Sequence, residues 1–316
     1  MSKSTQPAAV KPRKKPFFTN DDLWGYAFIG VAVIFFLMFT IWRFCWRPPP
    51  RSCATLSAVI TSLEDYKPFG SDFVGLKNYQ TTFTNALFWK SLKNTLIYTA
   101  VVVPLSLLIS FSVAILIMPF KKKLQSVFKA MYYLPAVASG IALSVVWLWI
   151  YDSSPSGLFN QLLTFFHLPT QNWLGSSKTS MLSLMIMALL SGQGQNIIIY
   201  TAALLGIDNT YFEAAELDGA TFMQKVTRIV FPLVKPTTLF LLVTGVIGSF
   251  QVFMNAYMMT GGGPDNATTM IGLLIYNNAF TYNKYGLACA QAVILTIIIA
   301  AISFLQFKMA GSDVEY

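Results

Sequence analysis

Long uninterrupted apolar blocks constrain the fold of this chain more than any other feature of its sequence. Six blocks have close to the ~20 residues that a helix needs to cross a hydrocarbon core. They occupy residues 24–42, 94–118, 131–150, 181–206, 237–259 and 286–307. A backbone in lipid must satisfy its own hydrogen bonds, and these blocks are too long and too evenly apolar for barrel strands. The sequence therefore predicts an all-α polytopic membrane protein with about six transmembrane helices.

The basic residues predict how the chain is oriented. The net charge is +9, although only 11% of the residues are charged. More than half of the Lys and Arg residues lie in 1–20, 121–129 and 225–235 or at Lys308. These segments share one side of the membrane if the N-terminus is cytoplasmic, and cytoplasmic loops are enriched in positive charge. The pattern favours a multi-pass protein with both termini in the cytoplasm, and it explains the charge better than nucleic-acid binding does.

The remaining segments set the domain organisation. Residues 1–20 are basic, polar and proline-containing, and we expect a disordered cytoplasmic tail there. Residues 21–316 are expected to form one transmembrane permease domain, with its longest loop over 43–93. Within that loop, residues 43–60 are either a genuine external loop or an irregularity of the sequence. The three cysteines and the single histidine lack metal-ligand spacing, so no metal site is expected.

An amphipathic segment, 208–236, separates the fourth and fifth blocks. Its residues 210–213 match a capping box, which predicts a short helix that runs to Asp218. Gly219 allows the left-handed backbone that ends such a helix.

A second helix is predicted directly after this turn. Thr221 and Gln224 repeat the capping pattern, and Pro232 and Pro236 are expected to bend or end the helix. The segment thus reads as a helix, a tight turn and a helix that face the cytoplasm. Its few basic residues argue against a DNA-binding helix-turn-helix.

The chain carries no visible means of powering transport by itself. Residues 175–180, the nearest approach to a phosphate-binding loop, lack the G-x-x-x-x-G-K-[ST] spacing. The cores of the second to sixth blocks hold no Asp, Glu, His or Lys, the residues that ion-driven carriers use. The energy then comes from another subunit, or the pore is passive.

Uncharged polar residues within the fourth and fifth blocks bound the class of solute. Amides both donate and accept hydrogen bonds, which suits a neutral, hydroxyl-rich solute, whereas a phosphate or carboxylate would call for a fixed charge. Two pairs, Asn196 with Tyr200 and Gln251 with Asn255, are spaced four apart and are expected to share a helix face. The alternative is that these amides only link helices. The candidate solute-contacting residues are Gln193, Gln195, Asn196, Tyr200, Gln251 and Asn255.

The segment 208–236 resembles the EAA loop of binding-protein-dependent ABC transporter permeases. The family pattern is Glu-Ala-Ala, three residues, Gly, nine residues, then Ile-x-Leu-Pro. This chain has Glu213, Ala214, Ala215, Gly219, Ile229 and Pro232 at those positions, with Phe231 in place of the usual leucine. Three further stretches resemble the sugar branch of the family, the maltose and glycerol-phosphate type: FVGLKNY at 73–79, LDGAT at 217–221 and TGGGP at 260–264.

The resemblance implies an ABC importer type I permease fold and a division of labour. Two permeases, the second a homologous hetero-partner, would form the pore in a bacterial plasma membrane. Two ATPase subunits would bind ATP and Mg, and an extracellular binding protein would deliver a neutral sugar or oligosaccharide. This chain would itself be no enzyme and would hold no cofactor. The residues expected to dock the ATPase are Glu213, Ala214, Ala215, Asp218, Gly219, Ile229 and Pro232. An ATP-independent secondary carrier or channel for a small polar solute is the alternative.

The resemblance gives Glu213 a contact with a basic residue of the ATPase, and this contact can be tested. We expect Glu213→Lys to abolish uptake, because it places like charges opposite each other, while membrane insertion stays intact. Transport assays and membrane fractionation of the same cells would check both halves. Normal ATPase-coupled uptake by the variant would contradict the docking role.

Overall fold

A computed structural model of the chain describes residues 54–67 and 70–310. Its contacts separate residues 1–57 from residues 58–316, and the architecture below is that of the second unit. The predicted tail, the first predicted span and the arginine- and proline-rich stretch 43–52 lie outside the described residues.

The predicted long loop before the second span is largely structured where it is described. It holds helix α2 (Ala54–Ser62), the antiparallel strands β1 (Glu64–Lys67) and β2 (Gly70–Phe73), and helix α3 (Lys77–Thr84). Asn78 ties these elements together, because its amide nitrogen donates to the carbonyl oxygens of Ser62 and Glu64, both at 3.0 Å. The hydroxyl groups of Tyr79 and Ser62 lie 2.7 Å apart. Two residues of the FVGLKNY stretch, Asn78 and Tyr79, therefore attach α3 to the end of α2 and the start of the β1–β2 strand pair.

Two long helices confirm the second and sixth predicted spans. They are α4 (Ala86–Ile117) and α16 (Tyr285–Ala310), and both are long and apolar enough to cross a membrane. Helix α4 begins before the predicted residue 94, because the side chain of Asn85 caps it by accepting from Leu87 N–H. Hydropathy alone could not place this start, since Lys90 and Lys93 lie in the first turns.

The third, fourth and fifth predicted spans are not single straight helices, and this corrects the prediction. The third is α5 (Lys122–Val137) followed by α6 (Gly140–Ile150), bent by 98°. The fourth is α8 (Ser180–Ser191) followed by α9 (Gly194–Leu205), bent by 42°. The fifth, α13 (Lys235–Phe250), ends before the predicted residue 259, and α14 (Met254–Thr260) is a separate helix. The high average hydropathy of each block hides such breaks, which lie at Ser139, Gly192 and Gln251.

The other described elements are short and connect these helices. They are α7 (Leu158–Phe165), α10 (Asn209–Leu217), α11 (Phe222–Lys225), a π-helical turn (Val226–Val230), α12 (Phe231–Leu233), α15 (Ile271–Tyr276) and a second π-helical turn (Asn277–Thr281). If each bent pair is one span, the described residues hold up to five spans. The predicted helical membrane fold is confirmed.

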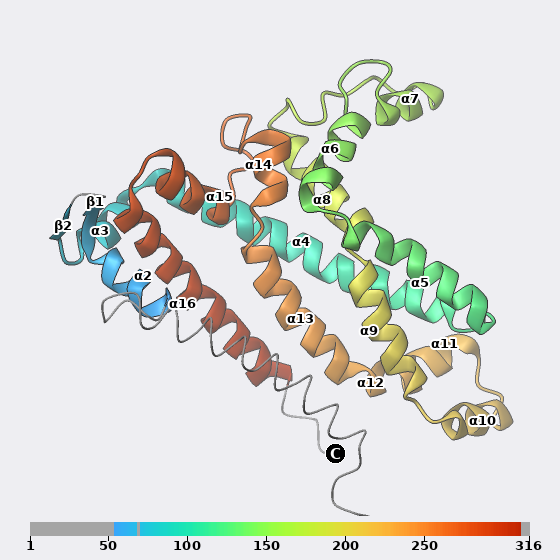
Figure 1. Cartoon of the computed structure of the whole chain (residues 1–316). Coiled ribbons are helices and arrows are strands. Elements are labelled where there is room, and N and C mark those ends of the chain that lie inside the picture. The colour runs from blue at the N-terminus through green and yellow to red at the C-terminus, as the bar shows by residue number, and fades with distance from the viewer. Residues whose placement is uncertain (1–53, 68–69, 311–316) are drawn as a thin grey trace, which may run out of the picture. The chain divides into compact units, whose positions relative to one another are not determined.

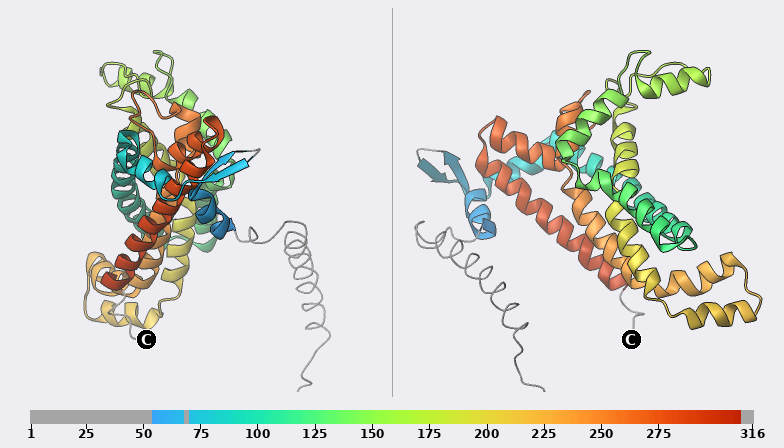
Figure 2. Two further views of the ribbon diagram at one scale, coloured as in Figure 1. Left: turned by 90° about the vertical axis from the view of Figure 1, so that its left-hand side faces the viewer. Right: turned by 45° about the vertical axis from the view of Figure 1, so that its right-hand side comes forward.

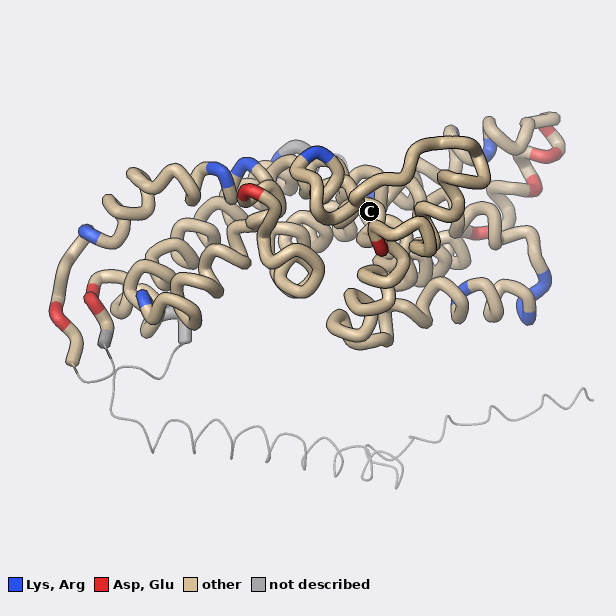
Figure 3. Tube along the Cα trace, turned by 90° about the horizontal axis from the view of Figure 1, so that it is seen from above, with Lys and Arg blue, Asp and Glu red and all other residues tan. Residues whose placement is uncertain are grey.

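Helix α4 lies at the centre of the described bundle and packs against α8, α9, α13 and α15 (Figures 1 and 2). Buried side chains of α4, α9, α13 and α16 form one continuous apolar core. Lysine, arginine and acidic residues are few, and long stretches of the helical trace carry none of them (Figure 3). This distribution is the one expected of helices that cross a hydrocarbon layer.

Gly194 allows α9 to approach α5 closely. A Cβ atom at this position would collide with the carbonyl oxygen of Tyr132 and would lie 2.6 Å from the Cα of Tyr133. Both obstacles are backbone atoms, so they cannot turn aside as a side chain would. Close backbone approach at small residues is a common way for membrane helices to associate.

We therefore expect Gly194→Ala to destabilise the protein by about 1–3 kcal/mol, the usual cost of overpacking. Gly248→Ala is the matched control, because Gly248 also lies in a helix and a Cβ there meets nothing within 4 Å. Thermal unfolding of both variants in detergent would compare them. Equal unfolding temperatures would show that the contact between α5 and α9 is not tight.

Candidate functional site

The segment 208–236 folds as the predicted helical hairpin, with one correction at its start. Asp208, not Thr210, caps α10, because the carboxylate of Asp208 accepts from Thr210 N–H at 2.9 Å. This hydrogen bond holds the pKa of Asp208 below its ordinary value. Asp208, Asn209 and Thr210 can all serve as caps, and the sequence pattern selected the wrong one. Glu213 consequently closes no capping box and is exposed.

The turn of the hairpin forms as predicted. Gly219 has φ +68°, in the left-handed region, and Ala220 N–H donates to Ala215 C=O at 2.9 Å across the helix end. Thr221 and Gln224 make a complete capping box that starts α11. These local interactions therefore reverse the direction of the chain sharply between α10 and α11.

The hairpin presents apolar side chains that none of the residues described in the structure covers. Leu217, beside the turn, is 91% exposed, and Tyr211, Phe222 and Met223 are also exposed. Of the predicted docking residues, Glu213, Ala214, Asp218, Gly219 and Pro232 are exposed, Ile229 is half-buried and Ala215 is buried. Five of the seven are thus accessible to a partner, while Ala215 packs inside the hairpin.

The hairpin is attached firmly to the helices behind it. Lys225 forms a 2.7 Å ion pair with Glu216 across the turn, and Val230 belongs to the main apolar core. The chain then passes through the π-helical turn and α12, and it bends by 66° into α13 at Val234, between Pro232 and Pro236. The prediction that these prolines bend the second helix is confirmed.

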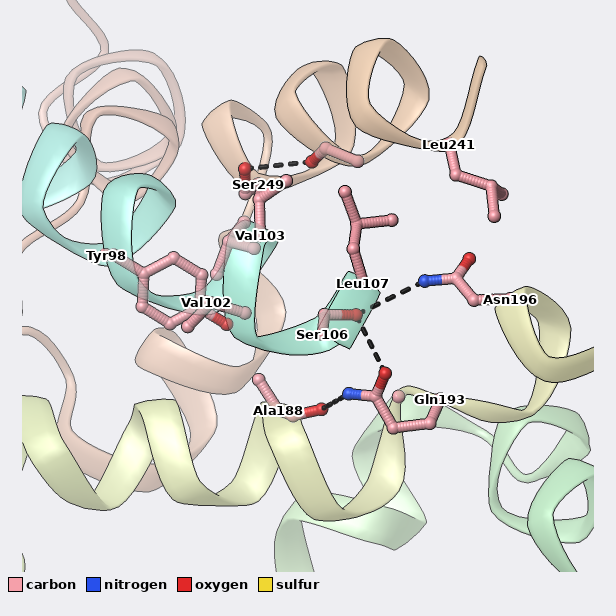
Figure 4. Close-up of a pocket in the computed structure, with 13 residues that line it drawn as sticks. Tyr98, Val102, Val103, Ser106, Leu107, Ala188, Gln193, Asn196, Leu241 and Ser249 are labelled. Carbon is pink, nitrogen blue, oxygen red and sulfur yellow. Dashed lines mark hydrogen bonds between the residues drawn. The ribbon is translucent and has the colours of Figure 1, made fainter. Parts of the chain in front are cut away.

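A pocket of about 190 Å³ lies between α4, the junction of α8 with α9, and α13 (Figure 4). Gln193 and Asn196 line it, as does Ser106 of α4. Ser106 Oγ donates to Gln193 Oε1 at 2.8 Å and accepts from Asn196 Nδ2 at 3.2 Å. Ser110 Oγ also donates to Gln193 Oε1 at 2.8 Å, and Gln193 Nε2 donates to Ala188 C=O at 3.4 Å. Within residues 54–67 and 70–310, no charged side chain lines this pocket.

Of the six candidate solute-contacting residues, only Gln193 and Asn196 line this pocket. Tyr200 is buried, and its hydroxyl donates to Thr238 Oγ1 at 3.2 Å, so it links α9 to α13 outside the pocket. Gln195 is exposed and does not line the pocket that holds Gln193 and Asn196. The four-residue spacing of Asn196 and Tyr200 therefore did not place both in one cavity.

Gln251 and Asn255 do not share a helix face, and that prediction is wrong. Gln251 ends α13, and the chain breaks before α14 begins at Met254. Asn255 instead lines a second pocket of about 350 Å³, together with Ser191 and Gly192. The two pockets share Ala188 and Gly192, so they flank the same helix junction.

The sequence analysis missed two polar residues at this junction, Ser106 and Ser110. They lie four residues apart in an otherwise apolar helix, the spacing that puts two side chains on one face. That spacing was the available signal, and it was overlooked because serine commonly bonds to its own helix backbone.

The left-handed turn at Gly219 generates a prediction about the hairpin. Gly219→Ala should cost about 1–2 kcal/mol, because an L-residue is strained at φ +68°. Gly206→Ala is the control, since Gly206 ends α9 at φ −81°. Hydrogen exchange of the amides in 209–225 should speed up in the first variant only. Unchanged exchange in Gly219→Ala would contradict the described turn.

Comparison with known proteins agrees with this architecture. Residues 95–310 match the family model described as "Binding-protein-dependent transport system inner membrane component". The chain is 30% identical over 311 residues to the arabinooligosaccharides transport system permease protein AraP of Bacillus subtilis, a match that covers 96% of this chain and 94% of AraP. It is 28% identical to the lactose transport system permease protein LacF of Rhizobium radiobacter, over 92% of this chain and 94% of LacF.

A solved structure shows the same fold. It is that of a bacterial ABC transporter involved in the import of the acidic polysaccharide alginate. One of its chains aligns with a TM-score of 0.76 at 21% identity, over 93% of this chain and 97% of that one. The chain is thus a membrane-embedded ABC transporter permease subunit, and it belongs to the family of binding-protein-dependent transport system inner membrane components.

Proposed function

We propose that this permease imports a neutral sugar or oligosaccharide, driven by ATP that a separate subunit hydrolyses. The observation that carries the proposal is the exposed hairpin at 208–236, which offers Glu213 and Leu217 to a partner. An aliphatic side chain that is 91% exposed at the tip of an ordered turn is suited to insertion into another protein. ATP and Mg would be bound by that partner and not by this chain.

The pocket supports a neutral solute. Its polar groups are the uncharged side chains of Tyr98, Ser106, Gln193, Asn196 and Ser249. An acidic solute would call for a compensating cation, and the described residues that line the pocket include no Lys, Arg or His. The names of the relatives agree, because AraP is named for arabinooligosaccharides and LacF for lactose. Asn196 is the strongest of the candidate solute contacts, since it is only half-buried and keeps an oxygen for solute.

The arrangement of the helices supports a cytoplasmic hairpin with partners on both sides of the membrane. The hairpin and the end of α16 lie at one end of the bundle, and α7 lies at the other (Figures 1 and 2). With the C-terminus in the cytoplasm of a bacterium, the hairpin would meet two ATPase subunits. An extracellular binding protein would then dock at the opposite end, and a second, homologous permease would complete the pore.

Reconstitution tests the proposal. The permease pair, its ATPase and its binding protein would be placed in liposomes, with radiolabelled arabinobiose and lactose as probes. Uptake of at least one sugar should require ATP, the ATPase and the binding protein. Uptake down a gradient by the permeases alone would instead favour the alternative, an ATP-independent carrier or channel.

Substitutions of Leu217 in the same uptake assay test whether this side chain contacts the ATPase subunit. Leu217→Asp should lower ATP-driven uptake by roughly tenfold or more, because a carboxylate would be buried in an apolar contact. Leu217→Met keeps the volume and the apolar character, and it should stay within about twofold of the unmutated complex. Full uptake by Leu217→Asp would show that Leu217 does not enter the partner.

A further inference from the structure

The hydrogen bonds around the junction of α8 and α9 have a fixed direction. Gln193 is 2% exposed, and both ends of its amide are engaged. The carbonyl oxygen of Ala188 can only accept, so the Gln193 nitrogen must point towards it. The Gln193 oxygen then faces the two serine hydroxyls of α4 and accepts from both.

This orientation determines what Ser106 can do next. A serine hydroxyl has one proton, and Ser106 donates it to Gln193 Oε1. Ser106 can therefore only accept from Asn196, which must turn its nitrogen towards the serine. The carbonyl oxygen of Asn196 is left on the far side, turned away from Ser106 and towards Leu241, another lining residue of the pocket (Figure 4).

We infer that Gln193 is a positioning residue which, through Ser106, makes Asn196 present a hydrogen-bond acceptor to the solute. This inference rests on the proposed function and deepens it. Asn196 would select a solute hydroxyl that donates at that point, and Gln193 would set this selectivity without touching the solute. An amide that could turn freely would accept from or donate to the solute and would discriminate less.

Two serines provide a matched pair of variants. Ser106→Ala and Ser110→Ala each remove one hydroxyl that donates to Gln193 Oε1. Only Ser106 also bonds to Asn196. A merely structural role for the cluster would make the two variants behave alike. The chain of hydrogen bonds from Gln193 through Ser106 to Asn196, here called the relay, instead predicts a change of selectivity in Ser106→Ala alone.

Deoxyfluoro sugars report the difference, because fluorine replaces the donating hydroxyl and cannot donate. Arabinobiose and lactose, each with single-position deoxyfluoro derivatives, are compared for ATP-driven uptake by the reconstituted complex. For the derivative that lacks the hydroxyl bound by Asn196, the uptake rate of the parent sugar divided by that of the derivative should be roughly two- to tenfold in the unmutated complex. This ratio corresponds to the free energy of one neutral hydrogen bond. Ser110→Ala should keep that ratio, and Ser106→Ala and Gln193→Met should bring it close to one.

Comparing variants with the unmutated complex removes the binding protein's own preference, because that protein is the same throughout. An equal ratio in Ser106→Ala and Ser110→Ala, with ATP-driven uptake retained, would overturn the relay. Absence of ATP-driven uptake in the unmutated complex would count against the proposed function instead.

A double-mutant cycle tests the relay without any solute. The shifts in the unfolding temperature of the assembled complex should be non-additive for Gln193→Met combined with Asn196→Leu. This coupling should disappear in a Ser106→Ala background and persist in a Ser110→Ala background. Coupling that Ser106→Ala leaves unchanged would mean that the two amides interact by another route, and the relay would be rejected.

Discussion

A helix that breaks inside a bilayer leaves backbone and side-chain polar groups that water cannot reach, and those groups must find partners within the protein. At the junction of α8 and α9 the partners come from one side of α4, where Ser106 and Ser110 bond to Gln193. On another side, Gly194 lets α9 lie directly against the backbone of α5. The break is thereby held between α4 and α5, and its polar side chains Gln193 and Asn196 line a pocket.

The same constraint explains why the pocket is polar without being charged. An isolated charge at this depth would cost several kcal/mol, whereas an amide with three or four bonds is nearly satisfied. Asn196 is the exception, since its side-chain nitrogen donates to Ser106 and its side-chain oxygen does not take part in that bond. The pocket can therefore offer solute a hydrogen bond that the protein does not need for its own stability.

The sequence predicted those features that depend on composition or on short local patterns. The length of the apolar blocks located α4 and α16, and the spacing from Glu213 to Pro232 identified the hairpin, its glycine turn and its second cap. Breaks within apolar segments were not predicted. Residues 191–196 are all glycine or polar, but the apolar residues before and after them keep the whole block hydrophobic enough to look like one span, and the break at Ala138 and Ser139 between α5 and α6 is hidden in the same way. The separation of Gln251 from Asn255 follows from such a break. The spacing of Ser106 and Ser110 indicated a shared polar face on α4, but nothing local in the sequence indicated that Gln193, 83 residues after Ser110, would bond to it.

The bond between Tyr200 and Thr238 lies near the root of the hairpin, on the two helices that lead into and out of it. Because this hydrogen bond joins α9 to α13, a movement of one of these helices would also displace the other. A load applied at the tip would therefore reach α9 and α13 together, and both of these helices pack against α4. The pocket lined by Gln193 and Asn196 lies between these helices and α4, so a displacement of the turn would be transmitted to its walls.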